Sequence, residues 1–542
     1  FVPEHNEGES FPLIVHSHGW GGSRFSVADA EALDPAPADT DASYFDLVDR
    51  QVETLWNAGY AVISFDERGF GGTAVGASAS DDGDPASGDG AHGMSVQHEI
   101  QDAIAIIDWA VENAESGELL ADLAFDDAGR LDPKIGTLGG SYGGGFQLML
   151  AAIDERVDVL VPSATWFNFE ESLLTNGAIK KAYGHGLCLL AQTDGANLAP
   201  EVAQACQEGS TVITNREAAD ASQASQDVFI NNSLKTVSET PGFTMPQVDA
   251  LLLQGTRDIL FNLGQAVQSY NFLTAAGGDV RLMSHEDGHG VRELRSGPGS
   301  QPELGDAFCG SVDAIVNIVN WFDEKLKGIS DAANMYPRIC LSLDDSQGVT
   351  VSGAPVPRGD DGSLTNLVAT IDDGAGAPLA LSGNDHHNRN GIVEEPSVQF
   401  ISAGTVADDS RVLAGVPTAN LTIAAGITNT DPTVASGPVA ALFIGVGIKR
   451  GSDFILIDDQ VQPILTPFDG AIDLVAVAED LQAGDEVGVL VYGQFDIYEG
   501  SIACVTDASG NNCGSNWLGN AVTVQGTVNL PIFDAVPDVR AP

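Results

Sequence analysis

The stretch Ile135-Gly-Thr-Leu-Gly-Gly-Ser-Tyr-Gly-Gly144 decides the fold of this chain. Its first four residues read as a short buried strand, and an apolar run typical of a helix, Phe146–Ala152, follows it. A G-x-S-x-G pattern between a strand and a helix predicts a nucleophile elbow, a sharp turn that exposes the hydroxyl of Ser141. Glycines are needed there because the turn leaves no room for a Cβ beside the serine. An ordinary glycine-rich turn is the alternative, since glycine is abundant (62 of 542 residues).

The elbow belongs to a longer alternation of strands and helices that runs to about residue 335. Short apolar runs predict strands at 12–16, 61–65, 135–138, 157–163, 250–254 and 279–283. Helical patterns lie between them, at 44–58, 95–114, 144–153 and 311–326. This rhythm predicts an α/β fold with a mainly parallel sheet covered by helices on both faces. We assign residues 1–335 to this catalytic domain.

Two further regions are expected around that domain. The connection between the strands at 157–163 and 250–254 is too long for an ordinary loop, so residues 165–249 are predicted to form a helical cap over the serine; a remote structural insertion is the alternative. After Tyr336-Pro337 the helical periodicity ends and short β-type runs follow, at 338–343, 367–371, 440–448, 472–478 and 486–492. Residues 336–542 are therefore predicted to form an antiparallel β-sandwich domain.

The charge balance excludes several classes of partner. The chain has 77 acidic and 23 basic residues, a net charge of −54. Basic residues are too scarce to coat a nucleic acid, and an anionic membrane would repel the surface. No apolar run approaches the about 20 residues that span a bilayer, so no membrane segment is expected. The excess of acid suggests, as a hypothesis, a halophilic or marine source whose salt screens the self-repulsion.

The six cysteines form three pairs that are close in sequence: Cys188/Cys206, Cys309/Cys340 and Cys504/Cys513. None has the C-x-x-C spacing of a zinc site. The pairs favour three disulfides and therefore a secreted, extracellular or periplasmic protein, although six cysteines allow 15 pairings. No signal peptide is visible, and because the chain begins at Phe1 we expect a processed or trimmed N-terminus.

An elbow serine requires a base and an acid. In α/β folds with this kind of elbow the acid follows the serine in the chain, and the histidine follows the acid. The strand at 250–254 is followed by Gly255-Thr-Arg-Asp258, which places Asp258 at the carboxyl end of a buried strand and makes it the expected acid; a turn-capping aspartate is the alternative. His289, in Gly288-His-Gly290 after the last strand of this group, is the expected base. His285 in the same loop is the alternative base.

Two donors are required to stabilise the oxyanion that forms when the serine attacks a carbonyl. The backbone N–H of Tyr142, directly after the serine, is the first candidate. The glycine-rich loop His16-Ser-His-Gly-Trp-Gly-Gly22 supplies the second, which we assign to the backbone N–H of Trp20, with its indole lining the acyl pocket. The alternative is that Trp20 only lines the pocket and that its backbone N–H points elsewhere. Trp166 and Phe167 at the start of the cap are the other expected pocket residues.

These motifs resemble the α/β-hydrolase superfamily, and within it the group that contains cocaine esterase and Xaa-Pro dipeptidyl peptidases. The resemblance rests on two motifs: Gly140-Ser-Tyr-Gly-Gly144 with Gln147, and Phe65-Asp-Glu-Arg-Gly-Phe-Gly-Gly-Thr73 after an early strand. The β-rich end, including 441–447 and 474–488, is similar to the jelly-roll domain of that group. The chain departs from the members that use a tyrosine hydroxyl in the oxyanion hole, because it has Trp20 in that loop. Asp66 and Arg68 are expected to support loop structure.

The resemblance implies a serine hydrolase, and we favour hydrolysis of carboxylic esters through an acyl-enzyme. Aromatic cap residues suit hydrophobic acyl groups, and polymeric (polyester) substrates are conceivable. An Xaa-Pro dipeptidyl peptidase is the alternative; it would need a carboxylate pocket for a free amine, for which Glu170 and Glu171 are candidates. A non-catalytic extracellular binding protein is the third possibility, but it predicts a broken triad.

No organic cofactor is expected, because neither a phosphate-binding loop nor a nicotinamide fingerprint is present. No metal is assigned to the catalytic site. The loop at 384–395 (Asn-Asp-His-His-Asn-Arg-Asn-Gly-Ile-Val-Glu-Glu) carries oxygen ligands and could bind a structural calcium, but its spacing departs from an EF-hand and a solvated loop is favoured.

Overall fold

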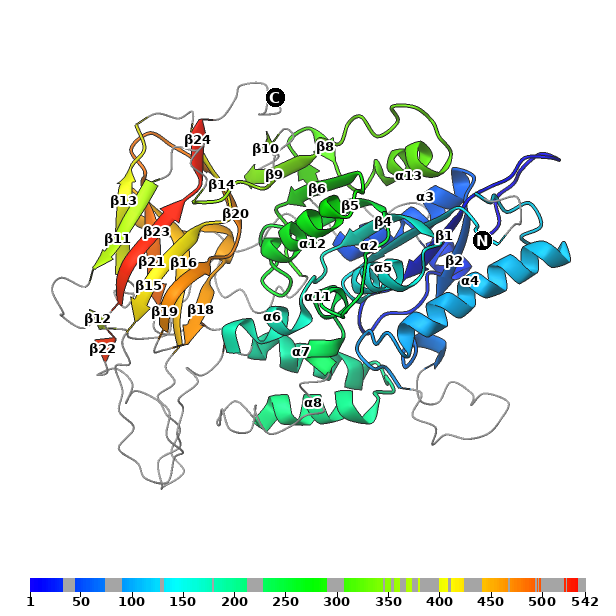
Figure 1. Cartoon of the computed structure of the whole chain (residues 1–542), viewed down its shortest axis with the longest axis horizontal. Coiled ribbons are helices and arrows are strands. Elements are labelled where there is room, and N and C mark those ends of the chain that lie inside the picture. Colours follow the sequence, from blue (N-terminus) through cyan, green and yellow to red (C-terminus); the bar gives the residue numbers. More distant parts are fainter. Residues whose placement is uncertain are drawn as a thin grey trace.

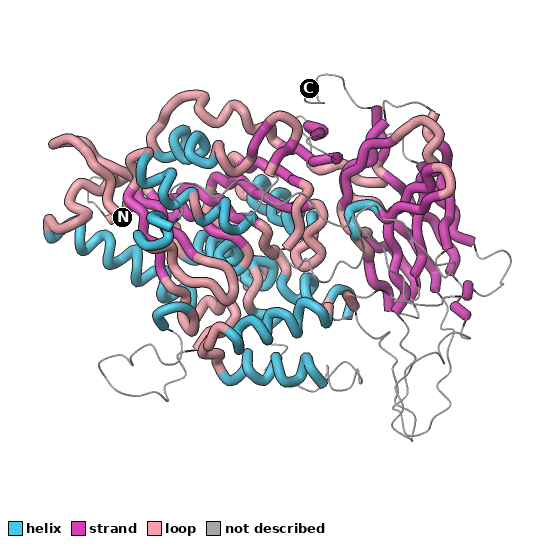
Figure 2. The backbone as a smooth tube through the Cα atoms, turned by 180° about the vertical axis from the view of Figure 1, so that it is seen from behind, coloured by secondary structure: helices cyan, strands magenta, loops and turns pink. Residues whose placement is uncertain are grey.

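The structure is a computed structural model of the chain. It describes residues 1–32, 44–73, 90–126, 131–177, 180–211, 228–289, 307–344, 347–351, 355–360, 367–372, 379–380, 399–407, 411–423, 441–465, 468–492, 495, 497–498, 521–522 and 524–534. An α/β part and a β-rich part lie side by side (Figure 1). Figure 2 shows from behind that helices flank the strands of the first part, whereas the second consists mainly of strands.

An eight-stranded sheet organises the α/β part, in the order β10-β9-β6-β5-β4-β3-β1-β2. All neighbours pair in parallel except β9 and β10. The strands are β1 (Leu13–Ser17), β2 (Ala61–Phe65), β3 (Ile135–Gly140), β4 (Val157–Ser163), β5 (Asp249–Gly255), β6 (Val280–His285), β9 (Ile339–Asp344) and β10 (Gln347–Val351). The six predicted strands are therefore present, and they are apolar because a parallel sheet is buried on both faces.

Helices cover both faces of this sheet, and successive strand residues point into two different cores. Leu13 and Leu252 pack on one side with helices α4, α5 and α12, whereas Ile14 and Leu251 pack on the other with α2, α3 and α13. The helices of this part are α1 (Val27–Ala32), α2 (Tyr44–Asp49), α3 (Gln51–Asn57), α4 (Glu99–Ser116), α5 (Tyr142–Ile153), α12 (Leu263–Ala275) and α13 (Ile318–Leu326).

Two predicted helices differ from the structure. The pattern at 44–58 forms two helices, α2 and α3, which meet at Arg50. The pattern at 311–326 becomes helical only from Ile318, because the preceding residues form a small hairpin of β7 (Phe308–Cys309) and β8 (Val312–Asp313). In that hairpin Cys309 forms a disulfide with Cys340 of β9, which ties the segment to the sheet.

The described residues of the segment between β4 and β5 include several helices joined by loops. It contains α6 (Phe169–Leu173), the 3₁₀ turn η2 (Thr175–Gly177), α7 (Lys181–Thr193), α8 (Pro200–Thr211) and α11 (Leu234–Ser238). The Cys188–Cys206 disulfide joins α7 to α8. The indole Nε1–H of Trp20 donates to the carbonyl of Leu187, 2.9 Å away, so α7 contacts the loop that follows β1.

The β-rich part contains two main antiparallel sheets that share one hydrophobic core. One sheet has the order β11-β23-β15-β19, formed by Leu367–Asp372, Val524–Leu530, Thr418–Ile423 and Phe468–Asp473. The other has the order β13-β21-β16-β17 with β18 beside β16, formed by Gln399–Thr405, Glu486–Tyr492, Ala441–Arg450, Asp453–Leu456 and Gln462–Leu465. Two smaller sheets comprise β20 (Val477–Leu481), β14 (Arg411–Gly415) and β24 (Ile532–Asp534), and β12 (Leu379–Ala380) with β22 (Ala521–Val522).

Two sequence predictions about this region need correction. The boundary after residue 335 falls too early, because β9 pairs in parallel with β6 and carries β10, so the large sheet continues to Val351. Ile339, Leu341 and Leu343 of β9 are buried in a core that includes residues of the large sheet and also residues of β14 and β20. The expected strand at 472–478 is also wrong, since β19 ends at Asp473 and β20 begins at Val477.

Two features singled out in the sequence cannot be placed in the structure. The pair Cys504/Cys513 and the loop at 384–395 lie outside the described residues. Among the described residues, no group of three or more His, Cys, Asp or Glu side chains is arranged to hold a metal ion. No described helix is long and apolar enough to cross a bilayer.

Candidate active site

The turn between β3 and α5 holds Ser141 in a strained conformation, with φ 56° and ψ −114°. Such backbone angles are costly for a residue with a side chain and persist only where the surroundings enforce them. The neighbouring glycines show what enforces them here. A Cβ at Gly139 or Gly143 would lie 2.3 or 2.0 Å from the carbonyl oxygen of Ser17 at the end of β1. The elbow is therefore pressed against the loop that leaves β1.

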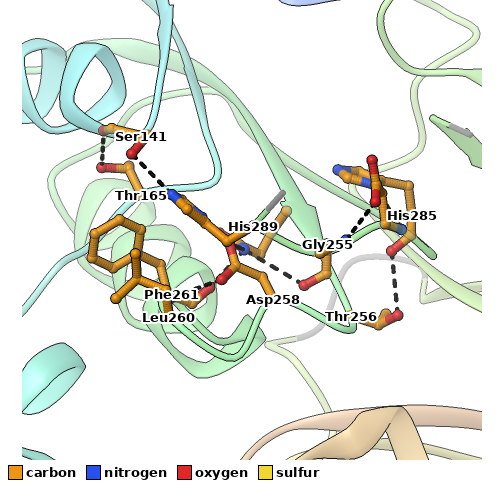
Figure 3. A network of polar contacts seen from close by, with 12 residues as sticks. Ser141, Thr165, Gly255, Thr256, Asp258, Leu260, Phe261, His285 and His289 are labelled. Carbon is orange, nitrogen blue, oxygen red and sulfur yellow. Dashed lines mark hydrogen bonds and ion pairs between the residues drawn. The ribbon is translucent and has the colours of Figure 1, made fainter. Parts of the chain in front are cut away.

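Three side chains predicted to act together form one hydrogen-bonded row (Figure 3). Ser141 Oγ lies 2.9 Å from His289 Nε2, and His289 Nδ1 lies 2.7 Å from Asp258 Oδ2. Since a carboxylate only accepts, Nδ1 carries the proton and Nε2 is left to accept the serine O–H. This is the tautomer that a general base for the serine requires.

The loop after β5 orients the Asp258 carboxylate, which is fully buried. Its Oδ1 accepts from the backbone N–H of Phe261 at 2.8 Å, and its Oδ2 accepts from Gln254 Nε2 at 3.1 Å as well as from His289. The Phe261 ring stands edge-on to the His289 imidazole, with 4.9 Å between the centroids. Phe261 and Gln254 were not anticipated from the sequence.

His285, the alternative base, occupies a different place. It ends β6, is 1% exposed, and its Nδ1 accepts from the backbone N–H of Asp287 at 3.3 Å. Figure 3 shows it on the far side of Gly255 from Ser141. Burial lowers the pKa of His285 to about 3, so its imidazole is neutral at ordinary pH. The geometry favours His289.

The loop after β1 approaches the nucleophile closely. A Cβ at Gly19 would lie 3.7 Å from the Cβ of Ser141, so the main chain of this loop passes beside the serine. Tyr142 begins α5, where the first backbone N–H groups of a helix have no intrahelical acceptor. The two predicted oxyanion donors, the N–H groups of Tyr142 and Trp20, thus belong to segments that flank Ser141.

A buried polar pair fixes this loop and was missed from the sequence. The backbone N–H of Glu67 donates to His18 Nε2 at 3.0 Å, so His18 Nδ1 carries the proton and donates to the carbonyl of Gly19 at 2.7 Å. Burial lowers the pKa of His18, which keeps it neutral. Burial also raises the pKa of the Glu67 carboxyl to about 8, and that carboxyl accepts from Ser17 Oγ at 2.6 Å. Both residues lie within the quoted motifs, but no local pattern reveals that they are buried together.

Aromatic side chains pack against residues next to the catalytic row. The Trp20 ring lies 5.2 Å from that of Tyr142, and the Trp166 ring lies 5.0 Å from that of Phe261. Trp166 is 2% exposed and packs over α5, where a Cβ at Gly145 would lie 2.4 Å from its ring. The ring of Phe167, also expected in the pocket, packs against Phe272 of α12.

Two charged residues of the motif after β2 make structural contacts. Asp66 accepts from the backbone N–H groups of Arg24 and Gly72, at 2.8 and 3.0 Å. Arg68 forms a two-pronged pair with Asp102 of α4, with both distances 2.6 Å. Both residues therefore hold the loop in place, as the sequence suggested.

Comparison with known proteins gives a family match and a set of similar folds. Residues 1–291 match the family model described as X-Pro dipeptidyl-peptidase (S15 family). No curated protein matches the chain. A CocE/NonD family hydrolase from Staphylococcus aureus is similar in structure, with TM-score 0.56 and 13% identity over 97% of this chain and 89% of that one.

Two other solved structures cover nearly the whole chain. An alpha-amino acid ester hydrolase has TM-score 0.53 and 15% identity over 97% of this chain and 93% of that one. An aminopeptidase from the marine sediment archaeon Thaumarchaeota archaeon has TM-score 0.51 and 13% identity over 98% and 93%. At these identities the likeness is one of fold, and it extends over both the α/β and the β-rich parts.

Proposed function

This chain belongs to the X-Pro dipeptidyl-peptidase (S15) family of hydrolases, and we propose that it is a secreted serine hydrolase that cleaves carboxylic esters through an acyl-enzyme. The observation that carries the proposal is the row of contacts from Ser141 Oγ through His289 to Asp258, at 2.9 and 2.7 Å. A serine with a base and an oriented acid in that arrangement is built for nucleophilic attack on an acyl carbon.

In the proposed reaction, Ser141 Oγ attacks the ester carbonyl carbon while its proton passes to His289 Nε2. The carbonyl oxygen becomes an oxyanion that accepts from the backbone N–H groups of Tyr142 and Trp20. The C–O bond to the alcohol then breaks, and His289 gives its proton to the leaving oxygen. Water attacks the acyl-enzyme by the same steps, releasing the acid and restoring Ser141. Asp258 holds the imidazolium throughout.

The surroundings of the site support an ester with a hydrophobic acyl group over a peptide with a free amine. Trp20, which is partly exposed, packs against Tyr142 beside the serine, and the Phe261 ring packs against His289, so the immediate neighbours of the site are aromatic. An amine pocket would need an available carboxylate, yet Glu171 Oε2 already accepts from Gln265 Nε2 at 3.3 Å and from Gln268 Nε2 at 3.1 Å. Glu170, the other candidate, is exposed on α6. Polymeric esters with apolar acyl units are a further substrate class to be tested.

The location of the protein rests on separate observations. The two disulfides, Cys188–Cys206 and Cys309–Cys340, are compatible with an oxidising extracellular space. The net charge of −54 supports work in a saline medium, where counterions reduce the repulsion among carboxylates. Thermal unfolding at increasing NaCl tests this part: we expect the Tm to rise with salt, and a Tm that falls would contradict it.

The function is tested with an active-site probe and two substrate classes. A fluorophosphonate should label the wild type on Ser141 and leave a Ser141→Ala variant unlabelled. Turnover of p-nitrophenyl acyl esters should exceed that of Ala-Pro and Gly-Pro p-nitroanilides. Faster cleavage of the anilides would make the protein an Xaa-Pro peptidase, and absence of labelling would favour a binding protein.

A further inference from the structure

The loop that carries Asp258 is held by side chains from outside the large sheet. Its backbone carbonyls at Thr256 and Asp258 both accept from Gln460 Nε2, each at 2.9 Å. The carbonyl of Leu260 in the same loop accepts from Lys180 Nζ at 3.0 Å. Gln460 belongs to the β-rich part, whereas Lys180 lies in the insertion between β4 and β5. Alternate carbonyls of one short loop are therefore bound from two sides.

Gln460 is presented by a rigid segment. It follows the 3₁₀ turn η5 (Ile457–Asp459) and is 2% exposed. Asp458 and Asp459 both have a positive φ, 55° and 57°. This backbone conformation is strained for a residue with a side chain and persists only when the surrounding structure holds it. The Asp458 carboxylate accepts from the backbone N–H of Ala478 at 2.8 Å, which anchors the turn to β20.

Arg257 reinforces the same contact. Its guanidinium lies 3.3 Å from the Glu286 carboxylate, in the loop that leads to His289, and 3.5 Å from the Asp459 carboxylate. All three side chains are less than a tenth exposed. A buried guanidinium between carboxylates is bound tightly because breaking one partner leaves an uncompensated charge. The β-rich part is thus connected to both loops of the proposed acid–base pair.

Lys180 is unusual because its side chain is almost fully buried, at 1% exposure. Burial lowers the pKa of its ammonium to about 8, while Asp258 and Glu171 oppose that shift. The ammonium is therefore largely charged near neutral pH. A buried lysine costs free energy, so its place beside this loop suggests a role that packing alone does not explain.

We propose that Gln460 and Lys180 are positioning residues that hold the Asp258 loop, and through it His289, in register with Ser141. This inference rests on the proposed function, since it assigns both residues a part in that reaction. A displacement of the loop by a fraction of an ångström would lengthen the hydrogen bond between His289 and Asp258 and turn His289 Nε2 away from Ser141 Oγ. The β-rich part and the insertion would then both be components of the active site.

The first test replaces Gln460 with Met, which keeps the length and removes the amide donor. We expect kcat for a p-nitrophenyl ester to fall about tenfold with KM within about twofold, because orientation is lost and ground-state binding is not. The low-field proton resonance of His289 Nδ1–H, observed by NMR, should shift or broaden. Asn176→Ala is the matched control: Asn176 Nδ2 donates to the carbonyl of Pro463 at 2.9 Å, a bond that also joins the insertion to the β-rich part but does not involve the Asp258 loop.

The second test replaces Lys180 with Met and combines the two changes. The single variant should also lower kcat and move the same resonance, and the double variant should lose less than the product of the two single losses, because both act on one loop. Lys327→Met is the control, since Lys327 Nζ donates to the carbonyl of Ala58 at 2.7 Å, far from the site.

The outcomes separate this inference from the proposed function. If the wild type is labelled by a fluorophosphonate and Gln460→Met keeps kcat, the labelling rate and the resonance while its Tm falls as in Asn176→Ala, Gln460 is an interface residue only and the inference fails. If the wild type itself is not labelled, the proposed function fails first. A lowered kcat with an unmoved resonance would also contradict the positioning role.

Discussion

The two halves of the candidate active site are assembled in different ways. The nucleophile half comprises the β1 loop and the β3–α5 elbow, where backbone meets backbone: Gly139 and Gly143 pack against the carbonyl of Ser17. The acid–base half comprises the loops after β5 and β6. Side chains 80 residues away (Lys180) and more than 200 residues away (Gln460) hold it.

The difference shows which part of the site is positioned by close backbone packing at glycines and which part is positioned by side chains from distant segments. In the nucleophile half the geometry follows from a few glycines, because a residue with a side chain does not fit at those positions. A short sequence motif is therefore enough to predict it. In the acid–base half, Gly255 makes one contact of this kind, since a Cβ there would lie 2.0 Å from the carbonyl oxygen of Asp287, but the loop that follows it, from Thr256 to Phe261, contains no glycine. Its position depends on hydrogen bonds from other parts of the chain, and several of these must be made at once. Substitutions in the two halves should therefore fail in different ways.

The largest expected effect lies in the acid–base half. Asp258→Asn should lower kcat about 10⁴-fold, because an asparagine amide can donate to His289 Nδ1 and so favours the wrong tautomer of the base. Steady-state hydrolysis of a p-nitrophenyl ester measures the loss. Asp249→Asn is the control at the other end of β5, where the carboxylate lies 3.4 Å from Lys325 Nζ, and it should keep its kcat. A loss for Asp258→Asn of less than about tenfold would show that another group orients His289.

The next effect sharpens the contrast in the nucleophile half, where stability should suffer together with activity. A Cβ at position 143 would lie 2.0 Å from the Ser17 carbonyl oxygen, so Gly143→Ala forces β1 and α5 apart. We expect a loss of about 3 kcal/mol in stability, as overpacking of a rigid backbone contact implies. Thermal unfolding provides the measurement. Gly184→Ala in α7, where the new Cβ meets nothing within 4 Å, should leave the Tm unchanged or raised; equal Tm values for the two variants would contradict the steric account.

The same division explains how far the sequence could be interpreted. Six of the strands of the large sheet and the turn at Ser141 are predicted because apolar runs and glycines report local structure. The order serine, acid, histidine selected Asp258 and His289, which the structure brings into contact with Ser141. These inferences need only a strand, a turn and their sequence order.

Features that depend on distant partners were missed. β9 looked like a sandwich strand because its alternation is the same in either sheet, and only pairing with β6 decides its place. Gln460 and Lys180 carry no local pattern, since a glutamine and a lysine are ordinarily exposed. Glu67 and His18 were missed for the same reason: nothing near them in sequence shows that both are buried.

Glu67 offers a pH test of the nucleophile half. Burial raises the pKa of its carboxyl from 4.5 to about 8, so the folded protein holds the proton more tightly than the unfolded chain. Its contribution to stability is therefore complete below about pH 4.5 and is lost as pH rises through about 8. The Glu67→Gln side chain cannot lose a proton, so the variant should keep the stability that the wild type loses at high pH. At pH 9 its Tm should exceed that of the wild type by about 2–4 °C for each kcal/mol of unfolding free energy retained, and at pH 6 the difference should be smaller.

Thermal unfolding at both pH values measures this difference, and His18 is common to both proteins, so its own titration cancels. Glu112→Gln on the exposed face of α4 is the control, and its Tm should follow the wild type at each pH. A Tm difference between Glu67→Gln and the wild type that stays constant from pH 6 to pH 9 would mean that Glu67 does not titrate in this range.

The smallest expected effect concerns Trp20, which lies where the nucleophile half meets the inserted helices. Its indole N–H donates to the carbonyl of Leu187, so the oxyanion donor that we propose at this residue is the backbone N–H, which phenylalanine retains. Trp20→Phe should therefore lower kcat less than about threefold, whereas loss of a true oxyanion donor costs about a hundredfold or more. Trp56→Phe is the matched control, since its indole donates to the carbonyl of Val2 at 2.7 Å, away from the site. If Trp20→Phe lost a hundredfold and Trp56→Phe nothing, the indole would have to leave Leu187 during reaction, and the nucleophile half would depend on the inserted helices as much as the acid–base half does.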